Sequence, residues 1–456
     1  MAYKILEGIR VVDLTTVYAG PMGTRMLADL GAEIIKIESP KRPDLFTRMT
    51  AYPDNEPPEK ENWNAGGYFH LLNAGKLGIS LDLSTEKGKE IFKKLVKISD
   101  IVMETFSPRV MDNLGLGYEE LKKIKPDIIM VSMSGLGHYG PLRDYYMYMT
   151  GMEGMSGLTY ITGHPDQPPL LSNYAYGDWM LGVTGAAAAL TALYYRKKTG
   201  KGQYIDVAGR EAIVIHIGDV IMDYTLNGRV KERSGNANPE MAPHECYRCK
   251  GEDSWINIAV ENEEQWQALC KLMGKEELKD DPRFSTMEAR VKNRDELNKI
   301  IEEWTSQHDH LELMEKLQKE GIPAGAVLSM KEVHLNPHLI QRGFFEVIDH
   351  GKDVGKRPIG KQMPAKFVGL ESYTPSRAPR FAEHNEYVFC ELLGMSKEEL
   401  KKLEEEKVIG TVPRFPPGRP TRLDLIEKQA GKGAGYVDPN YLEELRKVFG
   451  EDIAKK

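Results

Sequence analysis

Two short runs, Ile9-Arg-Val-Val-Asp-Leu14 and Glu33-Ile-Ile-Lys-Ile-Glu38, decide the fold. Both are rich in Val and Ile, which favour β-strands. Between them a loop carries Gly20-Pro21, residues 22–30 follow a helical pattern, and Gly31 ends that pattern. A strand, a helix and a strand in this order predict a βαβ unit with parallel strands and a right-handed crossover.

The same alternation continues along the first two hundred residues. Strand patterns occur at residues 78–83, 100–104, 127–133 and 204–207. Helical patterns at 86–98 and 118–123 separate the earlier strands, and a long apolar helix is expected at 179–195. We therefore expect an α/β protein with an open, doubly wound, Rossmann-like sheet.

The rest of the chain indicates a second, smaller domain. Residues 227–243 are rich in Gly, Asn and Pro and predict a linker. Beyond it, residues 244–328 resemble an α+β unit, with a strand at 255–260 and helices at 263–273, 294–306 and 311–320. We expect residues 1–226 to form the N-terminal part of a large domain and residues 227–335 to hold the linker and the small domain. Residues 336–456 then supply a return linker, the C-terminal part of the large domain and an extra tail.

Composition excludes several classes of protein. The chain has 456 residues, 41% of them hydrophobic, and a net charge of −7, which suits a globular protein and argues against nucleic-acid binding. Four cysteines in so long a chain predict a reducing, cytoplasmic location without disulfides. Cys246 and Cys249 have metal-ligand spacing, but no second pair follows, so no metal site is expected. Neither a signal peptide nor a membrane span is expected.

Residues 135–140 read Gly-Leu-Gly-His-Tyr-Gly and match the dinucleotide-binding pattern GxGxxG. Pro141 follows, no helix is predicted there, and no strand with an acidic end comes about 20 residues later. The segment is therefore interpreted as a glycine-rich loop at a strand end.

Asp178 precedes the apolar helix and has two interpretations. Aspartate is a favoured N-cap, and most such residues have no other role. A carboxylate at the positive end of a helix dipole can also stay ionised and act as a nucleophile. The local sequence leaves both open.

Several motifs, in a fixed order, resemble the family III CoA-transferases. The first are the segments 8–21 and 27–38, which contain the two opening strands. They are followed by Asn73-Ala-Gly-Lys76, Glu104-Thr-Phe-Ser-Pro108, Ser134-Gly-Leu-Gly137 and Gly177-Asp178, then Thr199-Gly-Lys-Gly-Gln203, Pro282-Arg-Phe284 and Gly321-Ile-Pro323. The resemblance spans about residues 6–409. It implies a large and a small domain, and two chains interlocked as a dimer.

The resemblance also implies a mechanism and a site. Asp178 would attack a donor thioester, form an aspartyl anhydride and then an aspartyl–CoA thioester, and pass CoA to an acceptor acid. Gly135 and Gly137 would donate backbone N–H groups to oxyanions, and Tyr148 would lie at the substrate. CoA would contact the residues Val17, Tyr18, Ala19, Lys76, Thr105, Phe106 and Arg109.

The expected substrates are an acyl-CoA, with succinyl-CoA as a candidate donor, and a small carboxylic acid. No permanently bound cofactor is expected, since the CoA thioester is itself a substrate. The run of Tyr and Met side chains between 145 and 155 suits a bulky or aromatic acid, although it would suit a protein core equally. The partner chain would be a second copy, or a homologous subunit as in some relatives.

Two alternatives belong to other functional classes. Racemases of the same fold move an α-proton with a histidine, but this chain has Tyr148 at the matching place, and a phenol is a poor base at neutral pH. The spacing from Asp178 to Arg196 also follows the transferases. A CoA-binding protein without catalysis is disfavoured because the Gly177-Asp178 pair is retained.

Overall fold

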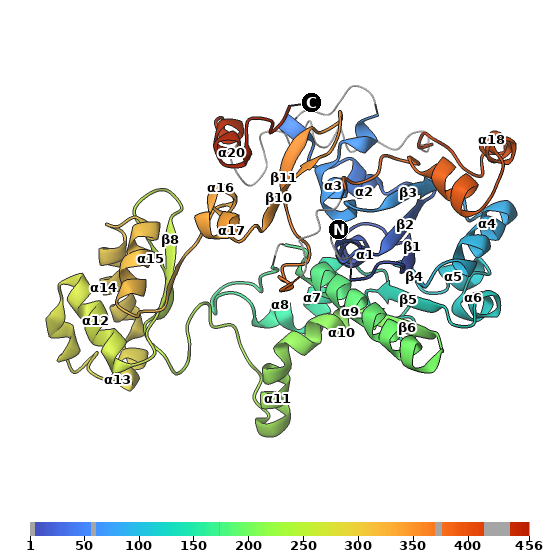
Figure 1. Ribbon diagram of the computed structural model, residues 1–456. Helices are drawn as coiled ribbons and strands as arrows, with labels where there is room; N and C mark the ends of the chain where they lie inside the picture. The colour runs from blue at the N-terminus through green and yellow to red at the C-terminus, as the bar shows by residue number, and fades with distance from the viewer. Residues whose placement is uncertain (1–4, 56–60, 173, 370–375, 415–437, 456) are drawn as a thin grey trace. The chain divides into compact units, whose positions relative to one another are not determined.

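The computed structural model describes residues 5–55, 61–172, 174–369, 376–414 and 438–455. The chain separates into two compact units, which we describe one at a time (Figure 1). The larger unit comprises Met1–Leu158, Leu171–Met222 and His334–Lys456, and the smaller comprises Thr159–Leu170 and Asp223–Val333.

A six-stranded parallel sheet forms the centre of the larger unit, in the order β3-β2-β1-β4-β5-β6. This is the strand order of a doubly wound fold, with its change of direction between β1 and β4. The strands are β1 (Arg10–Leu14), β2 (Glu33–Glu38), β3 (Leu77–Ser80), β4 (Ile101–Glu104), β5 (Ile129–Ser134) and β6 (Gln203–Ala208). The predicted parallel α/β sheet is confirmed.

Each face of the sheet has its own apolar core, because neighbouring residues of a strand point to opposite faces. Val11 belongs to one core and Val12 to the other. Helices α1 (Ala19–Asp29) and α9 (Tyr176–Thr199) cover the first face, while α4 (Glu86–Lys97) and α6 (Tyr118–Ile124) cover the second (Figure 1).

Helices α1 and α9 cross at two glycines. A Cβ on Gly182 would lie 2.3 Å from the Ala19 carbonyl oxygen, and a Cβ on Gly23 would lie 2.6 Å from the Gly182 oxygen. Only glycine permits so close an approach. The crossing brings the first turn of α9 near the end of β1.

The C-terminal segment of the larger unit protects the edge strand β3. The Gly78 N–H donates to His384 Nδ1 at 3.1 Å, and the Ser80 N–H donates to Asn385 Oδ1 at 3.0 Å. A π-helical turn, η5 (Tyr387–Leu392), packs Val388 and Phe389 into the second core. An exposed strand edge would otherwise offer unpaired backbone groups to other chains.

Regular structure also occurs where we expected a return linker. The segment from Asn336 onward contains α17 (Pro337–Gln341) and an antiparallel hairpin of β10 (Phe345–Asp349) and β11 (Lys356–Gly360). Asn336 begins α17 as its N-cap, since its side chain accepts from the N–H groups of His338 and Leu339. The capping box of Ser396 and Glu399 is confirmed at the start of α18 (Lys397–Glu405), and α20 (Tyr441–Phe449) follows. Residues 415–437 of the expected tail lie outside the described residues.

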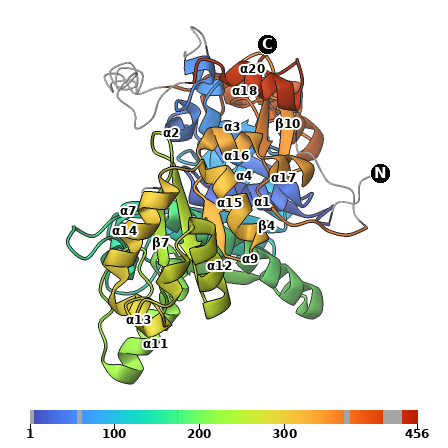
Figure 2. The ribbon, with the colours of Figure 1, turned by 90° about the vertical axis from the view of Figure 1, so that its left-hand side faces the viewer.

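The smaller unit is an α+β structure. Its antiparallel sheet has the order β7-β8-β9, from β7 (His244–Arg248), β8 (Trp255–Ala259) and β9 (Ala324–Ala326). Helices α12 (Glu263–Met273), α14 (Arg294–Thr305) and α15 (His310–Lys319) accompany this sheet (Figure 2). The apolar core of the unit includes the buried Trp266 and Phe284.

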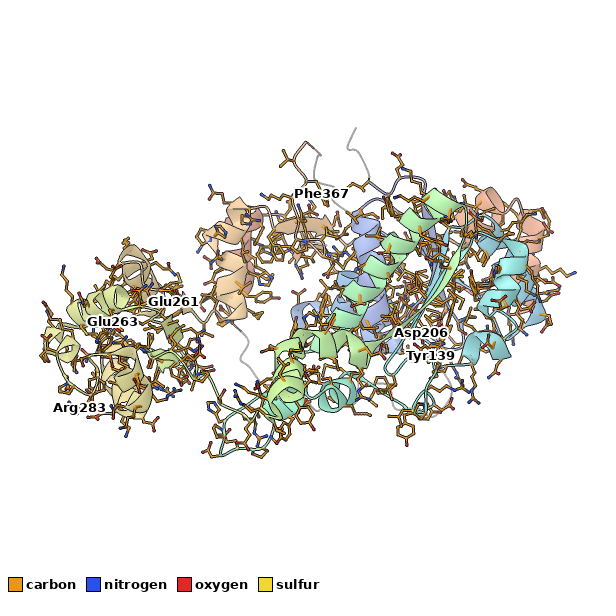
Figure 3. All side chains as sticks on the ribbon, turned by 90° about the horizontal axis from the view of Figure 1, so that it is seen from below. Tyr139, Asp206, Glu261, Glu263, Arg283 and Phe367 are labelled. Carbon is orange, nitrogen blue, oxygen red and sulfur yellow. The ribbon has the colours of Figure 1, made fainter. Side chains whose placement is uncertain are left out.

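Ion pairs also tie the smaller unit together. The buried Arg290 guanidinium pairs with Glu263 at 2.8 Å, and the exposed Arg283 pairs with Asp281 at 2.6 Å; Glu263 and Arg283 are labelled in Figure 3. Across both units, none of the described helices is long and apolar enough to cross a membrane.

Candidate active site

A cavity of about 220 Å³ opens in the larger unit at the carboxyl ends of β1, β4 and β5. Ligands of doubly wound folds bind at this edge, where the strand order changes direction. The loops that follow the three strands line the cavity, together with the start of α9. Its walls include the residues Thr16, Val17, Tyr18, Ala19, Thr105, Phe106, Met133, Ser134, Gly135, Arg143, Tyr145, Tyr146, Met147, Tyr148, Met152, Asp178 and Leu181.

Neighbouring strand ends hold the first of these loops in place. The Thr16 N–H donates to Thr105 Oγ1 at 3.0 Å, which joins the loop after β1 to the loop after β4. The Lys36 ammonium on β2 donates to the Thr15 carbonyl oxygen at 2.8 Å. These bonds cross strands 20 or more residues apart, so the loop geometry is a property of the assembled sheet.

Asp178 is the third residue of α9, because the helix begins at Tyr176. The interpretation of Asp178 as an N-cap is therefore wrong; Ala175 holds that position and makes no side-chain cap. Packing extends the helix backward, since Gly177 is buried and a Cβ on it would lie 2.8 Å from Ile213. The Asp178 carboxylate thus lies in the first turn, at the positive end of the dipole.

The surroundings of Asp178 disfavour the charged form of its carboxylate. Burial, followed by the nearby charge of Glu153, raises the pKa of Asp178 to about 6. No described residue forms a hydrogen bond or an ion pair with it. A carboxylate that is poorly solvated and unpaired is a better nucleophile than one held by a cation.

Sequence reasoning missed Glu153, which lies on α7 (Met149–Ser156) and is completely buried. Its carboxylate accepts from the Ser172 N–H at 3.1 Å and from the Ser172 Oγ–H at 2.8 Å. Residues 171 and 172 lead toward α9, so Glu153 also fixes the entry to the helix that carries Asp178. A lone glutamate in a Met-rich stretch gives no motif that would reveal this role.

Aromatic side chains form much of the cavity wall. Tyr18 lies beside Tyr68 and Phe46, with ring centroids 5.6 and 6.0 Å away. Burial raises the pKa of Tyr18, so its phenol remains a neutral hydrogen-bond donor. Tyr146 and Tyr148 are largely exposed, at 92% and 76%, and are available to a ligand. Met149 and Met155 of the same run lie outside the cavity lining.

Lys76 lies away from the cavity, and its ammonium is fully occupied. The side chain is buried, and Nζ donates to Asp13 Oδ2 at 3.0 Å, Thr24 Oγ1 at 2.7 Å, Asn73 Oδ1 at 2.9 Å and the Pro21 oxygen at 2.9 Å. Four partners leave no donor for a phosphate, because an ammonium has three hydrogens. The geometry favours a structural role for Lys76 over a CoA contact.

Two arginines, one at the cavity with Asp178 and one at a neighbouring cavity, are better placed to contact a phosphate. Arg109 is exposed and pairs with Asp144 at 2.8 Å; it lines a neighbouring cavity of about 600 Å³ rather than the one at Asp178. Arg143 lines both cavities. Sequence reasoning missed Arg143 because its loop has no periodic pattern.

The two glycines that we expected to stabilise oxyanions lie in the loop after β5, but only one of them lines the cavity. Gly135 lines the cavity, and a Cβ there would lie 2.5 Å from Met147. Gly137, with φ of 84°, lies against Asp206 on β6 and is not part of the lining. The His138 N–H donates to both Asp206 carboxylate oxygens at 2.9 and 3.0 Å, and Tyr139 follows (Figure 3). No helix follows this loop before α7, as expected for a segment that is not a dinucleotide fingerprint.

Comparisons with known proteins identify the family of the chain. The model of CoA-transferase family III matches residues 6–385. The chain is 33% identical to succinyl-CoA–D-citramalate CoA-transferase of Chloroflexus aurantiacus, over 89% of this chain and 98% of that protein. It is 34% identical to succinate–glutarate CoA-transferase of Agrobacterium fabrum, over 85% of this chain and 95% of that protein.

A solved structure, a CAIB/BAIF family protein from Brucella suis, superimposes with a TM-score of 0.76 at 36% identity. The alignment covers 85% of this chain and 99% of that one. The family match over most of the chain, and relatives alike over nearly their whole length, show that this protein belongs to CoA-transferase family III and is a CoA-transferase.

Proposed function

We propose that the enzyme moves CoA from a donor thioester to an acceptor carboxylic acid through Asp178. The observation that carries the proposal is the Asp178 carboxylate itself: it lines the cavity, has a pKa raised to about 6, and forms no ion pair with any cation among the described residues. Covalent catalysis by a carboxylate divides one difficult exchange into four easier acyl transfers.

Each step exchanges one bond at a carbonyl carbon. An Asp178 oxygen attacks the donor thioester, and CoA leaves as the thiolate while an anhydride forms. The thiolate attacks the Asp178 carbonyl and releases the donor acid. The acceptor carboxylate then attacks the aspartyl–CoA thioester, the thiolate leaves again, and its attack on the acceptor carbonyl releases the new acyl-CoA and free Asp178. N–H groups beside Gly135 stabilise the transient oxyanions.

We assign some residues of the cavity to CoA and others to the acyl group. Phe106 packs beside the CoA moiety, and Arg143, with Arg109 at the neighbouring cavity, provides positive charge for its phosphates. Val17, Tyr18, Ala19 and Thr105 complete the CoA contacts. Lys76 is not among them, since its donors are all used.

Succinyl-CoA is the donor we propose, because relatives that use succinyl-CoA or succinate are similar over most of the chain. For the acceptor we propose a bulky or aromatic acid. Tyr145, Tyr148 and Met147 offer a large, adaptable apolar surface on the cavity wall.

The test is trapping of the intermediate. Enzyme mixed with succinyl-CoA and no acceptor is treated with hydroxylamine, which converts an aspartyl anhydride or thioester into a hydroxamate. Peptide mass spectrometry should find donor-dependent hydroxamate on Asp178, and Asp178→Asn should lack both the label and the activity. Asp295→Asn, the same change at an exposed aspartate of α14, serves as the matched control. Labelling of another carboxylate would move the nucleophile, and full activity in Asp178→Asn would refute the mechanism.

The racemase alternative is not favoured, since the relatives are named as transferases and Tyr148 borders the cavity where a histidine base would be needed. We expect no solvent deuterium at the α-carbon of a 2-methylacyl-CoA during turnover.

We also propose that two copies of the chain assemble, in the interlocked manner that the resemblance implies. Large apolar side chains on α9 and on the helical turn η3 (Ile215–Ile217) are exposed, among them Tyr194 at 60% and Ile215 at 69%. Burial of such side chains stabilises subunit association. Light scattering of the purified protein should give twice the 51.5 kDa chain mass, and a monomer would refute the assembly.

A further inference from the structure

The loop that lines the cavity after β1 contains a strained residue. Val17 has φ of 66°, in the left-handed region, and its side chain is β-branched. Such residues almost never adopt this conformation, which persists only where surrounding contacts impose it. Val17, with its neighbours Tyr18 and Ala19, borders the cavity that contains Asp178.

The contact that imposes this conformation comes from Asp44, 27 residues along the chain. The Val17 N–H donates to Asp44 Oδ2 at 2.9 Å. Asp44 is only 4% exposed, so the bond is shielded from water. Asp44 also occupies the N-cap position of α2 (Leu45–Arg48), yet its side chain accepts no capping hydrogen bond from the backbone N–H groups of that helix. An aspartate at an N-cap ordinarily binds its own helix, and here the carboxylate is turned to Val17 instead.

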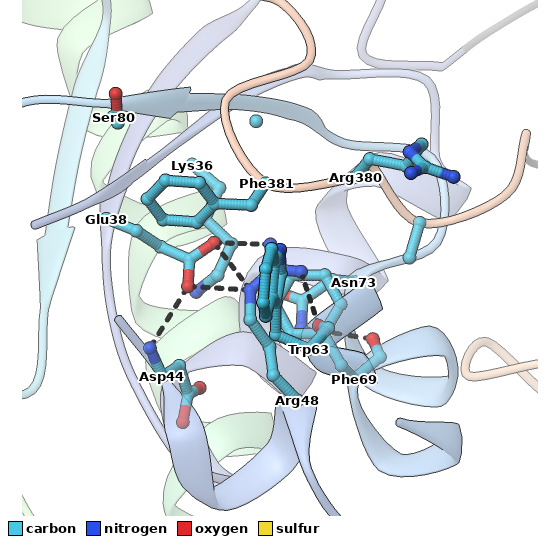
Figure 4. Close-up of polar contacts among 12 residues, drawn as sticks. Lys36, Glu38, Asp44, Arg48, Trp63, Phe69, Asn73, Ser80, Arg380 and Phe381 are labelled. Atoms are coloured by element: carbon cyan, nitrogen blue, oxygen red, sulfur yellow. Dashed lines mark hydrogen bonds and ion pairs between the residues drawn. The ribbon is translucent and has the colours of Figure 1, made fainter. Parts of the chain in front are cut away.

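Asp44 is itself held by a buried network (Figure 4). Its backbone N–H donates to Glu38 Oε1 at 3.1 Å, and Glu38 forms an ion pair with Arg48 at 2.5 Å. The Arg48 guanidinium lies 3.5 Å from the centre of the Phe69 ring and is fully buried. Thr47 Oγ1 donates to the Asp44 carbonyl oxygen at 3.4 Å. The network therefore fixes the position of the carboxylate that Val17 contacts.

We infer that Asp44 is a positioning residue of the acyl-transfer site, which holds Val17 in the left-handed conformation and so places Tyr18 and Ala19 against Asp178. The inference rests on the proposed function. Without an acceptor at Asp44, Val17 relaxes to negative φ, and the two residues after it turn away from the cavity. Misplacement of a cavity wall by about 1 Å is enough to lower turnover about 100-fold.

Four variants test the inference. Asp44→Leu removes the acceptor at similar volume and should lower kcat/KM about 100-fold. Asp44→Asn keeps a carbonyl oxygen and should remain close to the wild type. Val17→Gly in the Asp44→Leu background should restore most of the activity, because glycine adopts positive φ without strain. Asp309→Leu removes an acceptor of backbone N–H groups at the N-cap of α15, outside the cavity lining, and is the matched control, with activity unchanged.

A purely structural role for Asp44 gives a different pattern. Asp44→Leu would then lower the melting temperature while each folded molecule kept its activity, and Val17→Gly would restore nothing; either result overturns the inference. Crystal structures of Asp44→Asn and Asp44→Leu provide a readout that does not depend on activity. We expect φ of residue 17 to stay positive in the first and to become negative in the second. A positive φ in Asp44→Leu would overturn the inference, whereas an inactive wild type with the expected φ values would refute only the proposed function.

Discussion

The charge of a single residue, Asp178, should set the pH dependence of transfer. Its pKa is raised to about 6 by burial and by Glu153, and only the ionised carboxylate attacks a thioester. We therefore expect kcat/KM to be level above about pH 7 and to fall about tenfold for each pH unit well below 6. A pH–rate profile at saturating acceptor measures this fall in kcat/KM at acid pH, and a flat profile down to pH 4.5 would contradict the expectation.

The same pH–rate profile can separate the effect of the Glu153 charge on the pKa of Asp178 from the effect of burial. Glu153→Gln removes a negative charge near Asp178, so the acid limb should move to lower pH. Ser172→Ala is the control, because it removes a hydrogen bond to Glu153 but leaves its charge. A limb that stays in place in Glu153→Gln would show that burial alone raises the pKa of Asp178.

Lys76 illustrates a residue whose importance we expect to be structural. Burial raises the pKa of Asp13, but the ammonium groups of Lys76 and Lys36, together with two threonine hydroxyl groups, leave that pKa below its ordinary value. Lys76→Met leaves the Asp13 carboxylate buried without its nearest cation, which should cost about 3–5 kcal/mol of unfolding free energy.

Urea unfolding measures that cost. Lys41→Met is the control, since it removes an ion pair to Asp82 whose lysine is half exposed, and it should change stability little. If Lys76→Met instead remained stable and raised KM for the acyl-CoA, Lys76 would be a phosphate contact after all.

Among the secondary-structure elements, those with a clear period were predictable, and those shaped by distant contacts were not. The strands β1 and β2 and the helix α12 occur where the pattern places them. Helix α1, however, begins at Ala19, so Gly20-Pro21 is helical and not a loop. Proline is tolerated in a first turn because its missing N–H would have no partner there.

The candidate site shows the same division. Residues that follow strands directly, such as Thr105 and Phe106, could be placed because parallel strands end at one edge of the sheet. The burial of Lys76 and the contact between Asp44 and Val17 could not, since both depend on segments that lie far apart in the sequence. No local spacing records such contacts.

The crossing of α1 and α9 makes a prediction for a pair of elements. Gly182→Ala would place a Cβ 2.3 Å from the Ala19 oxygen, so the helices must separate. Because Ala19 borders the cavity and Asp178 lies one turn before Gly182, we expect both lower stability and lower activity. Gly154→Ala, at an open position of α7, is the control and should be neutral or stabilising by about 0.5–1 kcal/mol. Wild-type activity and stability in Gly182→Ala would contradict the close approach.

On the scale of the whole molecule, the larger unit joins segments from both ends of the chain. Two buried histidines mark one junction, and 280 residues separate them. His70 Nε2–H donates to the Asn64 carbonyl oxygen at 2.8 Å, which leaves His70 Nδ1 to accept from His350 Nδ1–H at 3.1 Å. The two rings cannot both be protonated in this arrangement, because two Nδ1–H groups would then face each other.

This junction should make the fold sensitive to acid. Burial lowers the pKa of His70 to about 4 and that of His350 to about 3, from 6.5 in the unfolded chain. Between pH 6.5 and 4 the unfolded chain binds protons that the folded chain does not. The free energy of unfolding therefore decreases as the pH is lowered, by up to about 1.4 kcal/mol per pH unit for each ring. Asp178 opposes this in part, since its raised pKa favours the folded state as pH falls below 6.

Urea unfolding at pH 7, 6 and 5 measures the slope. His350→Gln keeps a donor for His70 Nδ1 but cannot titrate, so it should remove about half of the histidine contribution, whereas the exposed His216→Gln should leave the slope unchanged. The difference between His350→Gln and the wild type isolates the junction, because both proteins share every other titrating group, including His138 and His384, whose pKa values are also lowered. A protein equally stable at pH 7 and 5, or an unchanged slope in His350→Gln, would mean that the two rings already bind protons in the folded state.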